Sequence, residues 1–475
     1  MTASRYLYQL FFTRIFWQVP AFYTYISMSY SAAIDQLNTM VPELYARPGQ
    51  PRRKFSLDEV RTLLAALGDP QLRFPSVLIA GTNGKGSTAA TLASILTVSG
   101  ARAGLYTSPH LERVNERIRI GNAEIADDDF ARLYFRVRDV AQMLVHESRL
   151  QQQPSFFEIL TAISVLYFAE QKVALAVLEV GMGGRLDATN IVDPLLSIIT
   201  DISLDHTEWL GSTIAAIARE KAGILRPGGT MIRLPQLNEA DDVLSEIAKE
   251  LGVRWVDVIE YLPSLVEGSA GYEYIVEVRG AKIQINSPLA GGHQRRNIAV
   301  AIAAAVELAC EHGFLITPYQ IGQGIRNTVW PGRLERIESD GRVWILDVAH
   351  NPAGAWAVRG GFSDVPGGRE AHTLIFSCLR DKPIAEIAQI LFPMFERVIL
   401  TPLHAARAAS IQDLTAAAQL TQTPFLVAES VADALQLASK QAGDSPIVIC
   451  GSVYLVGEAR SLLLAEPAES GGRAS

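Results

Sequence analysis

The stretch SVLIAGTNGKGST, residues 76–88, decides the fold class of this 475-residue chain. A short run typical of a buried strand, SVLIA, leads into a glycine-rich loop, and the helical pattern TAATLASILTVSG (88–100) follows at once. Glycines allow backbone N–H groups to converge on phosphate oxygens, while a helix N-terminus and a lysine add positive potential. The order of strand, loop and helix therefore predicts a binding site for a nucleoside triphosphate such as ATP.

The loop departs from the usual pattern G-x-x-x-x-G-K-[ST], because Gly81 lies only three residues before Gly84 and Gly86 separates Lys85 from Ser87. The alternative is a glycine-rich turn with an exposed lysine. If the loop binds ATP, the contacts with the nucleotide come from Thr82, Asn83, Gly84, Lys85, Gly86 and Ser87.

Outward from this loop, apolar strand-like runs alternate with amphipathic helical runs along most of the chain. VALAVLEV (173–180) and LLSIITDIS (195–203) are continuously apolar, as in a parallel sheet covered on both faces. Between residues 253 and 290 the pattern alternates instead, which predicts a small antiparallel insertion. The fold class is α/β, with a P-loop NTPase-like central domain on a mostly parallel sheet and a smaller Rossmann-like C-terminal domain.

The length predicts two domains, and the pattern breaks at Trp330-Pro331-Gly332-Arg333, after which a second α/β series begins. We place an ATP-binding domain at 28–332, a C-terminal α/β domain at 333–465 and a frayed tail at 466–475. Residues 1–27 are aromatic-rich and read as an extension outside the core; a transit peptide or interfacial helix is the alternative.

Composition excludes several classes of protein. Hydrophobic residues make up 49% and charged residues 19%, which is typical of a globular chain. The net charge of −8, without a basic block, argues against a nucleic-acid partner, and no apolar run reaches the roughly 20 residues of a membrane span. Cys310, Cys378 and Cys450 each lie in an apolar run, so we expect buried thiols in a cytoplasmic monomer.

Two strand ends carry candidate metal ligands. Glu179 ends an apolar strand just before a glycine-rich loop, and Asp205-His206 follows the next strand. Carboxylates at strand ends of α/β sheets face the ligand crevice, although a salt bridge is the alternative for Glu179. Mg²⁺ prefers oxygen ligands and bound water, so a histidine ligand would be unusual for it.

Eight ordered motifs between about residues 30 and 460 resemble the folylpolyglutamate synthase and dihydrofolate synthase branch of the Mur ligase superfamily. They are GTNGKGS (81–87), YTSPHLERVNERI (106–118), LEVGMGGRLDATN (178–190), TDISLDHTEWLG (200–211), REKAGI (219–224), WPGRLE (330–335), DVAHNP (347–352) and CGSVYLVGE (450–458). The resemblance implies an ATP-dependent ligase of folate and one-carbon metabolism. Such an enzyme activates a pteroate or folate carboxylate as an acyl phosphate and joins it to the amine of L-glutamate.

The resemblance also implies a metal centre. Ser108, Glu179 and His206 match the residues that hold two Mg²⁺ ions in this family. Lys221 matches a carbamylated lysine, N6-carboxylysine, whose negative charge supports the metals. From the sequence alone, Lys221 would instead be an exposed helical residue beside Glu220.

Further site residues follow from the same resemblance. Asn297, Arg333 and Asp347 match positions that contact ATP, although a hinge salt bridge is the alternative for Arg333. Asp347 and His350 would lie near ATP and the incoming glutamate, and Ser452 would help to hold glutamate. The candidate catalytic residues are Lys85, Lys221, Asp347 and His350.

The folate substrate would lie against the first domain. The candidate contacts, several of which are apolar enough to be core, are Lys54, Phe55, Ser56, Arg117, Phe156, Phe157, Glu158, Leu186, Asp187 and Ala188. Arg117 would bind a substrate carboxylate or simply pair with Glu116.

Three other functions would account for part of this pattern. A Mur-type peptidoglycan ligase would share the reaction, but LEVGMGGRLDATN weighs against it. A non-catalytic ATP-binding protein would not need Ser108, Glu179 and His206, and a P-loop kinase would not need a second α/β domain bearing DVAHNP.

Overall fold

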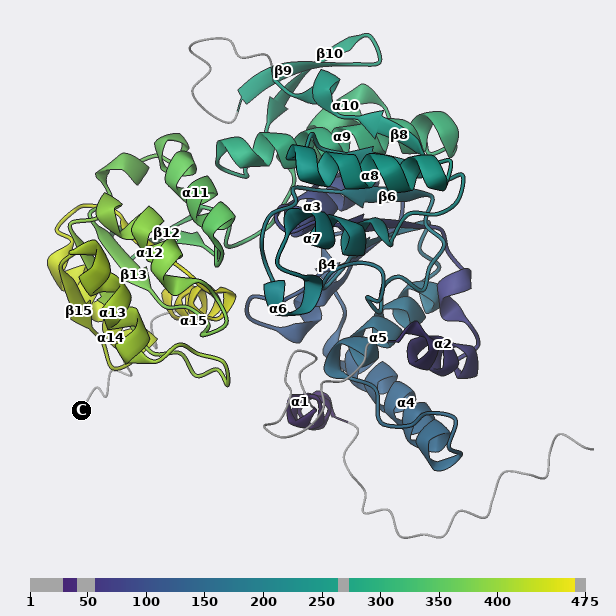
Figure 1. The fold of residues 1–475 in the computed structure, drawn as a ribbon, viewed down its shortest axis with the longest axis horizontal. Helices are drawn as coiled ribbons and strands as arrows, with labels where there is room; N and C mark the ends of the chain where they lie inside the picture. The colour runs from purple at the N-terminus through teal and green to yellow at the C-terminus, as the bar shows by residue number, and fades with distance from the viewer. Residues whose placement is uncertain (1–28, 41–55, 264–272, 466–475) are drawn as a thin grey trace, which may run out of the picture.

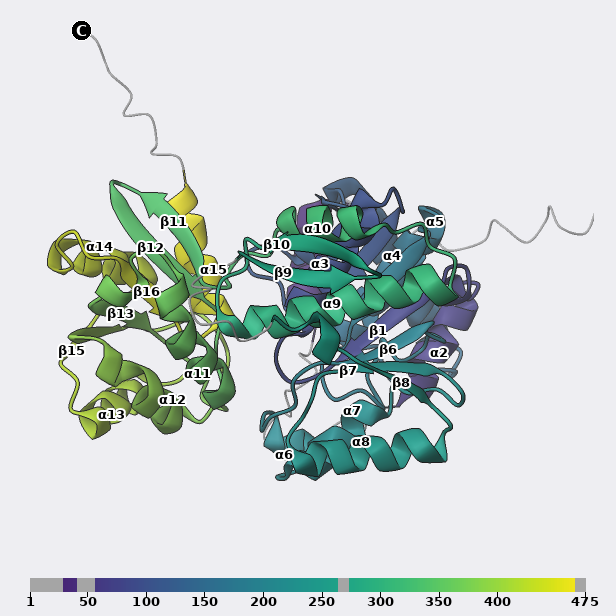
Figure 2. The ribbon, with the colours of Figure 1, turned by 90° about the horizontal axis from the view of Figure 1, so that it is seen from above.

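The computed structural model describes residues 29–40, 56–263 and 273–465 (Figure 1). The predicted extension 1–27, the tail 466–475 and the candidates Lys54 and Phe55 lie outside the described residues. Two α/β lobes lie side by side, each built on its own sheet (Figures 1 and 2). We call the lobe that carries the phosphate loop the large lobe and the other the small lobe.

The large lobe is built on a sheet of strand order β4-β3-β2-β5-β1-β6-β7-β8. The bounds are β1 Ser76–Ala80, β2 Ala103–Tyr106, β3 Ile118–Ile120, β4 Ala123–Glu124, β5 Leu175–Glu179, β6 Leu196–Ile199, β7 Thr230–Arg233 and β8 Arg254–Asp257. From β2 to β8 in this order neighbouring strands pair in parallel, and only β3 and β4 add antiparallel pairs. Since β1 lies between β5 and β6, the carboxyl ends of these three strands meet at one edge.

Helices cover both faces of this sheet, as the uninterrupted apolar strands predict. Leu78 and Ala80 of β1 pack into one hydrophobic cluster, whereas Val77 and Ile79 pack into another on the opposite face. The first cluster includes α1 (Tyr30–Thr39), α2 (Leu57–Ala66), α4 (Asp127–His146), α5 (Phe156–Glu170), α7 (Ile214–Ala222) and α8 (Asn238–Glu250). The second includes α3 (Lys85–Val98), α9 (Gly292–Glu311) and α10 (Pro318–Arg326).

The antiparallel insertion predicted between residues 253 and 290 is confirmed as the hairpin β9 (Glu273–Val278) and β10 (Ala281–Asn286), which packs on α10. A short helix, α6 (Thr207–Leu210), follows the loop after β6. Short 3₁₀ turns lie at Pro70–Leu72, Val114–Arg117, Ile259–Tyr261, Phe362–Asp364, Gly368–Glu370 and Phe392–Met394.

The small lobe has a sheet of order β11-β12-β16-β13-β14-β15, parallel except for β11. Its strands are β11 Glu335–Ser339, β12 Arg342–Asp347, β13 Thr373–Phe376, β14 Arg397–Leu400, β15 Phe425–Val427 and β16 Ile447–Cys450. On one face lie α11 (Pro352–Gly361), α12 (Ile384–Leu391) and α13 (Ile411–Thr421); on the other lie α14 (Val431–Gln441) and α15 (Val453–Leu464). The predicted fold class is thus confirmed, while the exact boundary at 332/333 stays a prediction.

One expectation about the thiols is wrong. Cys378 and Cys450 are buried, but Cys310 is exposed. It lies in the last turn of α9, two residues after the buried Leu308, and residues two apart point to nearly opposite sides of a helix. Among the described residues, no helix is both long and apolar enough to cross a membrane.

Candidate functional site

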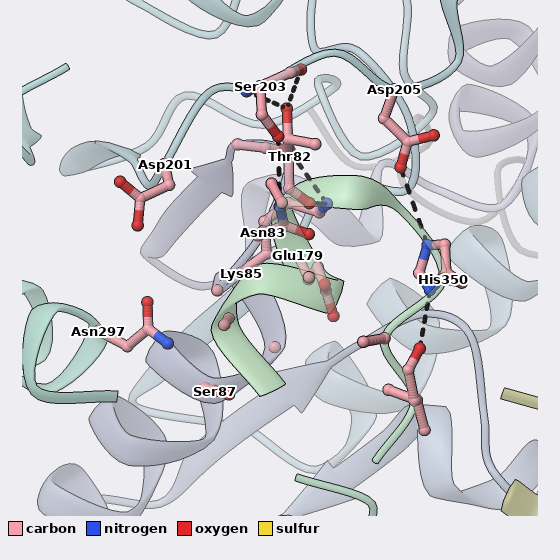
Figure 3. A pocket seen from close by; sticks show the side chains of 18 of the residues that line it. Thr82, Asn83, Lys85, Ser87, Glu179, Asp201, Ser203, Asp205, Asn297 and His350 are labelled. Atoms are coloured by element: carbon pink, nitrogen blue, oxygen red, sulfur yellow. Dashed lines mark hydrogen bonds and ion pairs between the residues drawn. The ribbon is translucent and has the colours of Figure 1, made fainter. Parts of the chain in front are cut away.

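A cavity of about 430 Å³ lies between the lobes, at the carboxyl ends of β1, β5, β6 and β12 (Figure 3). It gathers every candidate that the sequence assigned to ATP, metal or catalysis. These lining residues are Thr82, Asn83, Gly84, Lys85, Gly86, Ser87, Ser108, Glu179, His206, Lys221, Asn297, Arg333, Asp347 and His350. Residues far apart in the sequence, from Gly81 to Val453, therefore meet in one space.

The phosphate loop is held by its neighbours at the sheet edge (Figure 3). The Thr82 N–H donates to the Asp201 carbonyl at 2.7 Å, and the Lys85 ammonium donates to the carbonyls of Gly81 and Thr82 at 3.1 Å each. Gly84 has a φ of +85°, and a β-carbon there would lie 2.2 Å from the Asn297 side-chain oxygen. Glycine is required at Gly84 because both the backbone angle and the space exclude a side chain.

Glu179 lies at the base of the cavity. Its side chain is 5% exposed, and one carboxylate oxygen accepts the Ser108 N–H at 3.1 Å. Burial raises the pKa of Glu179, against the opposing effect of Lys85. Lys85, Arg333 and the Ser108 N–H offset only part of the cost of burying this carboxylate, and a bound cation would offset more.

The residues fit a magnesium site that is completed by nucleotide phosphates. Among the described residues, no three His, Cys, Asp or Glu side chains are grouped closely enough to hold a metal by themselves. Mg²⁺ commonly takes one or two carboxylates together with substrate phosphates and water, so a complete protein cage is not required. Glu179 could supply such a carboxylate, and the phosphate loop borders the same cavity.

Asp205 is the centre of a contact between the lobes. Its carboxylate accepts hydrogen bonds from the Lys382 ammonium at 2.6 Å and the Asn351 amide at 3.0 Å, and lies 3.8 Å from His350 Nε2. Burial would raise the pKa of Asp205, but the neighbouring His206, Lys382 and His350 outweigh it and hold the pKa well below its ordinary value. Asp205 is thus an anion that ties the β6 loop to the small lobe.

His206 adopts a left-handed backbone conformation, with φ +50° and ψ +37°, and its N–H donates to the Asp205 carboxylate at 2.8 Å. This conformation is uncommon for a residue with a side chain. Burial lowers the pKa of His206 to about 4, although Asp205 opposes the shift. The imidazole is therefore neutral at pH 7, the form in which histidine binds metals.

Lys221 is not the exposed helical residue that its sequence context suggests. Its side chain is 3% exposed, and its ammonium donates to the Gly81 carbonyl of the phosphate loop at 2.6 Å. Burial lowers the pKa of Lys221 well below its ordinary value. The lysine therefore faces the cavity, while Glu220 beside it pairs with Arg185 at 2.9 Å.

The small lobe contributes Asp347 at the end of β12. Its carboxylate accepts the N–H groups of Leu334 at 2.9 Å and Ala349 at 2.8 Å, so it shapes the turn that follows the strand. Burial raises the pKa of Asp347, and the nearby Arg333 opposes the shift. His350 is placed by a 2.9 Å hydrogen bond between Nδ1 and the Val348 carbonyl.

Those predicted substrate residues that the structure describes do not line this cavity, and several already have structural contacts. Ser56 and Ser452 are the N-caps of α2 and α15. Glu158 completes a capping box with Ser155 at the start of α5. Asp187 accepts hydrogen bonds from Met182 and Thr189, while Leu186 is half-buried and Ala188 buried.

Arg117 and Phe156 form a separate group. The Arg117 Nε donates to His110 Nδ1 at 2.9 Å, and its guanidinium lies 5.2 Å from the centre of the half-buried Phe156 ring. Phe157 is buried against Tyr106. The suggested pairing partner Glu116 accepts N–H groups of residues 111, 112 and 113 instead.

Sequence reasoning missed Lys382, which lies in a loop of the small lobe without a recognisable motif. It borders a second cleft of about 1060 Å³ that continues from Asp205 and His206 towards Trp209, Trp356 and Arg407. Asn351 was also missed as a site residue, although it lies within the quoted DVAHNP motif.

Comparisons with known proteins agree with this arrangement. Residues 79–305 match the Mur ligase middle domain, and residues 332–453 match the Mur ligase, glutamate ligase domain. The folylpolyglutamate synthase of Lacticaseibacillus casei is 35% identical over 448 residues, which cover 92% of this chain and 99% of that protein. The dihydrofolate synthase/folylpolyglutamate synthase of Bacillus subtilis is 33% identical over 422 residues, which cover 86% of this chain and 95% of that protein.

A similar solved structure is that of Mycobacterium tuberculosis folylpolyglutamate synthase complexed with ADP and AMPPCP. The TM-score is 0.79 at 32% sequence identity, over 87% of this chain and 96% of that one.

Proposed function

This chain belongs to the folylpolyglutamate synthase and dihydrofolate synthase family of Mur ligases, and from that premise we propose how it works as an ATP-dependent ligase. It joins L-glutamate to the carboxylate of a reduced pteroate or folate. The observation that carries the proposal is that one cavity unites the phosphate loop of the large lobe with Asp347 and His350 of the small lobe.

Two steps account for the chemistry. A substrate carboxylate oxygen attacks the γ-phosphorus of ATP, and the bond from that phosphorus to the ADP oxygen breaks, which yields an acyl phosphate and ADP. The glutamate nitrogen then attacks the acyl carbon; phosphate leaves and the nitrogen loses a proton. Activation is needed because a carboxylate is a poor electrophile, and a site enclosed by two lobes keeps water from the intermediate.

Cationic groups of the chain would stabilise the transferred phosphoryl group. Lys85 is held at the loop, and Arg333 lies close enough to Glu179 and Asp347 to interact electrostatically with both. Since Arg333 lies between the lobes, its contact with ATP would couple nucleotide binding to closure. Asn297 lies against Gly84 at the other side of the loop.

Ser108, Glu179 and His206 would hold Mg²⁺, in two ions as the family resemblance implies. Bound there, Mg²⁺ would neutralise charge on the phosphates and help to orient them. Two observations support this assignment: buried Glu179 accepts one hydrogen bond from the residues that the structure describes, and the imidazole of His206 is neutral.

Lys221 would be carbamylated. Carbamylation requires an uncharged amine, and burial favours that form of Lys221. The product carries a negative charge beside the phosphate loop, where it would support bound metal. Carbamylation would give a role to this buried lysine, whose ammonium hydrogen-bonds only to a loop carbonyl among the described residues.

Arg117 and Phe156 would contact the folate substrate, while Glu158 and Asp187 would hold the start of α5 and the loop after β5 in place beside it. An arginine that is stacked on an aromatic ring is well placed for a planar substrate that carries a carboxylate. Ser452 would act at the glutamate end, through its position at the start of α15. A monomer in the cytoplasm completes the proposal.

The test is a direct assay of the purified chain with ATP, Mg²⁺ and labelled glutamate, with dihydropteroate or tetrahydrofolate as acceptor. We expect ADP release that depends on both glutamate and acceptor, and products whose glutamate chain length shows which activity is present. ADP release that responds only to a peptidoglycan precursor would support the Mur-type alternative, and binding of ATP without turnover would support a non-catalytic role.

A further inference from the structure

Helix α15 presents one face to the large lobe. One side of this helix carries Val453 and the residues four, seven and eight positions after it, which are Gly457, Arg460 and Ser461. Val453 borders the main cavity and also a small cavity of about 50 Å³ shared with Ser108 and Glu179. The motif CGSVYLVGE thus does more than provide Ser452, because its later residues face the large lobe.

That face rests on the loop of residues 108–112. A β-carbon at Gly457 would lie 2.0 Å from the Leu111 carbonyl oxygen and 2.9 Å from its carbon, so the helix approaches the loop backbone as closely as glycine allows. Arg460 forms an ion pair with Glu112, and the Ser461 hydroxyl donates to Glu112 at 3.0 Å. Arg460 also pairs with Glu335 at 3.0 Å, which anchors it to β11.

The loop is a stiff link between this contact and the cavity. At the C-terminal end of the loop, the Glu116 carboxylate accepts the N–H groups of Leu111, Glu112 and Arg113 at 2.7 Å each. At its start, the Ser108 N–H holds the Glu179 carboxylate at 3.1 Å. A displacement of Leu111 cannot be absorbed freely, because the backbone groups on both sides of it are bound.

We propose that Gly457 and Glu112 are positioning residues, through which the docking of α15 on residues 108–112 places Ser108 and Glu179 for metal-dependent catalysis. The small lobe would thus position the metal centre through a second contact, separate from that of Lys382 with Asp205. The inference rests on the proposed function, because it assigns Ser108 and Glu179 to the metal. Its physical basis is that the partners of a metal-binding residue fix the orientation of that residue.

The main test is Gly457→Ala in the full chain. The added methyl group must push the Leu111 backbone, so the Mg²⁺ concentration for half-maximal activity should rise by about 10- to 100-fold, the usual scale for loss of a supporting contact. Calorimetry should show the same shift in the Mg²⁺ dependence of AMPPCP binding. The matched control is Gly360→Ala in α11, where a β-carbon would meet no atom within 4 Å.

A second pair of variants keeps the test decisive if Gly457→Ala does not fold. Glu112→Ala removes the acceptor for Arg460 and Ser461, whereas Glu112→Gln keeps an oxygen for one of them. We expect the requirement for Mg²⁺ to rise more for Glu112→Ala than for Glu112→Gln.

Two results would overturn the inference: a Mg²⁺ dependence of Gly457→Ala equal to that of Gly360→Ala, or Glu112 variants with lower melting temperatures and unchanged Mg²⁺ curves. A wild-type chain without ligase activity would instead refute the proposed function, and the AMPPCP measurement would still test the contact.

Discussion

Two of the regions in which the large lobe buries polar side chains differ in their hydrogen bonds. At the cavity, buried Glu179 accepts one backbone N–H and buried Lys221 donates to one carbonyl. At the start of α5 and in the loop after β5, Glu158 completes a capping box and Asp187 accepts N–H groups on both sides together with the Thr189 hydroxyl.

The difference separates two uses of the same chemical groups. Where protein hydrogen bonds satisfy a buried carboxylate, it stabilises a turn or a helix end. Where they leave it mostly uncompensated, the missing partner is a ligand. Substitutions in the cavity should therefore lower activity and spare stability, and substitutions in the second region should do the reverse.

The largest loss of activity is expected for Lys85→Ala. Among the described residues, the Lys85 ammonium hydrogen-bonds only to the loop carbonyls of Gly81 and Thr82. Its removal should lower turnover by about 10³-fold, near the upper end for one electrostatic stabiliser. The melting temperature should stay the same. Near-normal turnover would show that this loop does not bind the phosphates.

Lys221→Ala should lower activity by about 10²-fold or more, because it would remove an anion beside the metals. Acetate should restore part of the activity by entering the vacated space, and chloride at the same ionic strength should not. An Ala variant as active as the parent would refute the carbamate, and mass spectrometry of the intact protein in bicarbonate would check the modification directly.

The isosteric change Lys221→Met gives a stability readout in CO₂-free buffer. Burial lowers the folded-state pKa of Lys221 below the unfolded value of 10.5, so the charged form opposes folding at neutral pH. Lys221→Met should therefore raise the free energy of unfolding at pH 7, and the gain should fade as the pH approaches 10.5. A loss of stability at pH 7 would contradict this electrostatic account.

Glu179→Gln should lower activity by about 10²-fold with almost no change of shape. The loss should depend on Mg²⁺ concentration, and His206→Ala should be partly rescued by high Mg²⁺. Equal activity of Glu179→Gln and the parent across a Mg²⁺ titration would remove the metal role.

The smallest effect on activity is expected for Glu158→Ala. Loss of the capping box should lower the free energy of unfolding by about 1 kcal/mol, and Ser155→Ala should cost a similar amount. The kcat should stay within about twofold, since the cap does not border the cavity. An increase in KM for the pteroate acceptor at unchanged stability would instead place Glu158 at the substrate and break the comparison.

The sequence by itself determined the α/β class and much of the cavity. The phosphate loop and His206 follow strands, and Glu179 and Asp347 are the last residues of strands. The carboxyl ends of parallel strands meet at one edge whatever covers the sheet. Local pattern is enough for such positions, because the alternation of strand and helix places them.

Only the tertiary structure decided which polar groups are buried and which contacts cross the lobes. Lys221 has the local context of a surface helix, yet the packing of α7 under the phosphate loop buries it. Lys382 meets Asp205 across 177 positions, and Gly457 meets Leu111 across the interface between lobes. Periodicity in a sequence reports the face of one element, whereas burial and ion pairs depend on which elements are brought against that face.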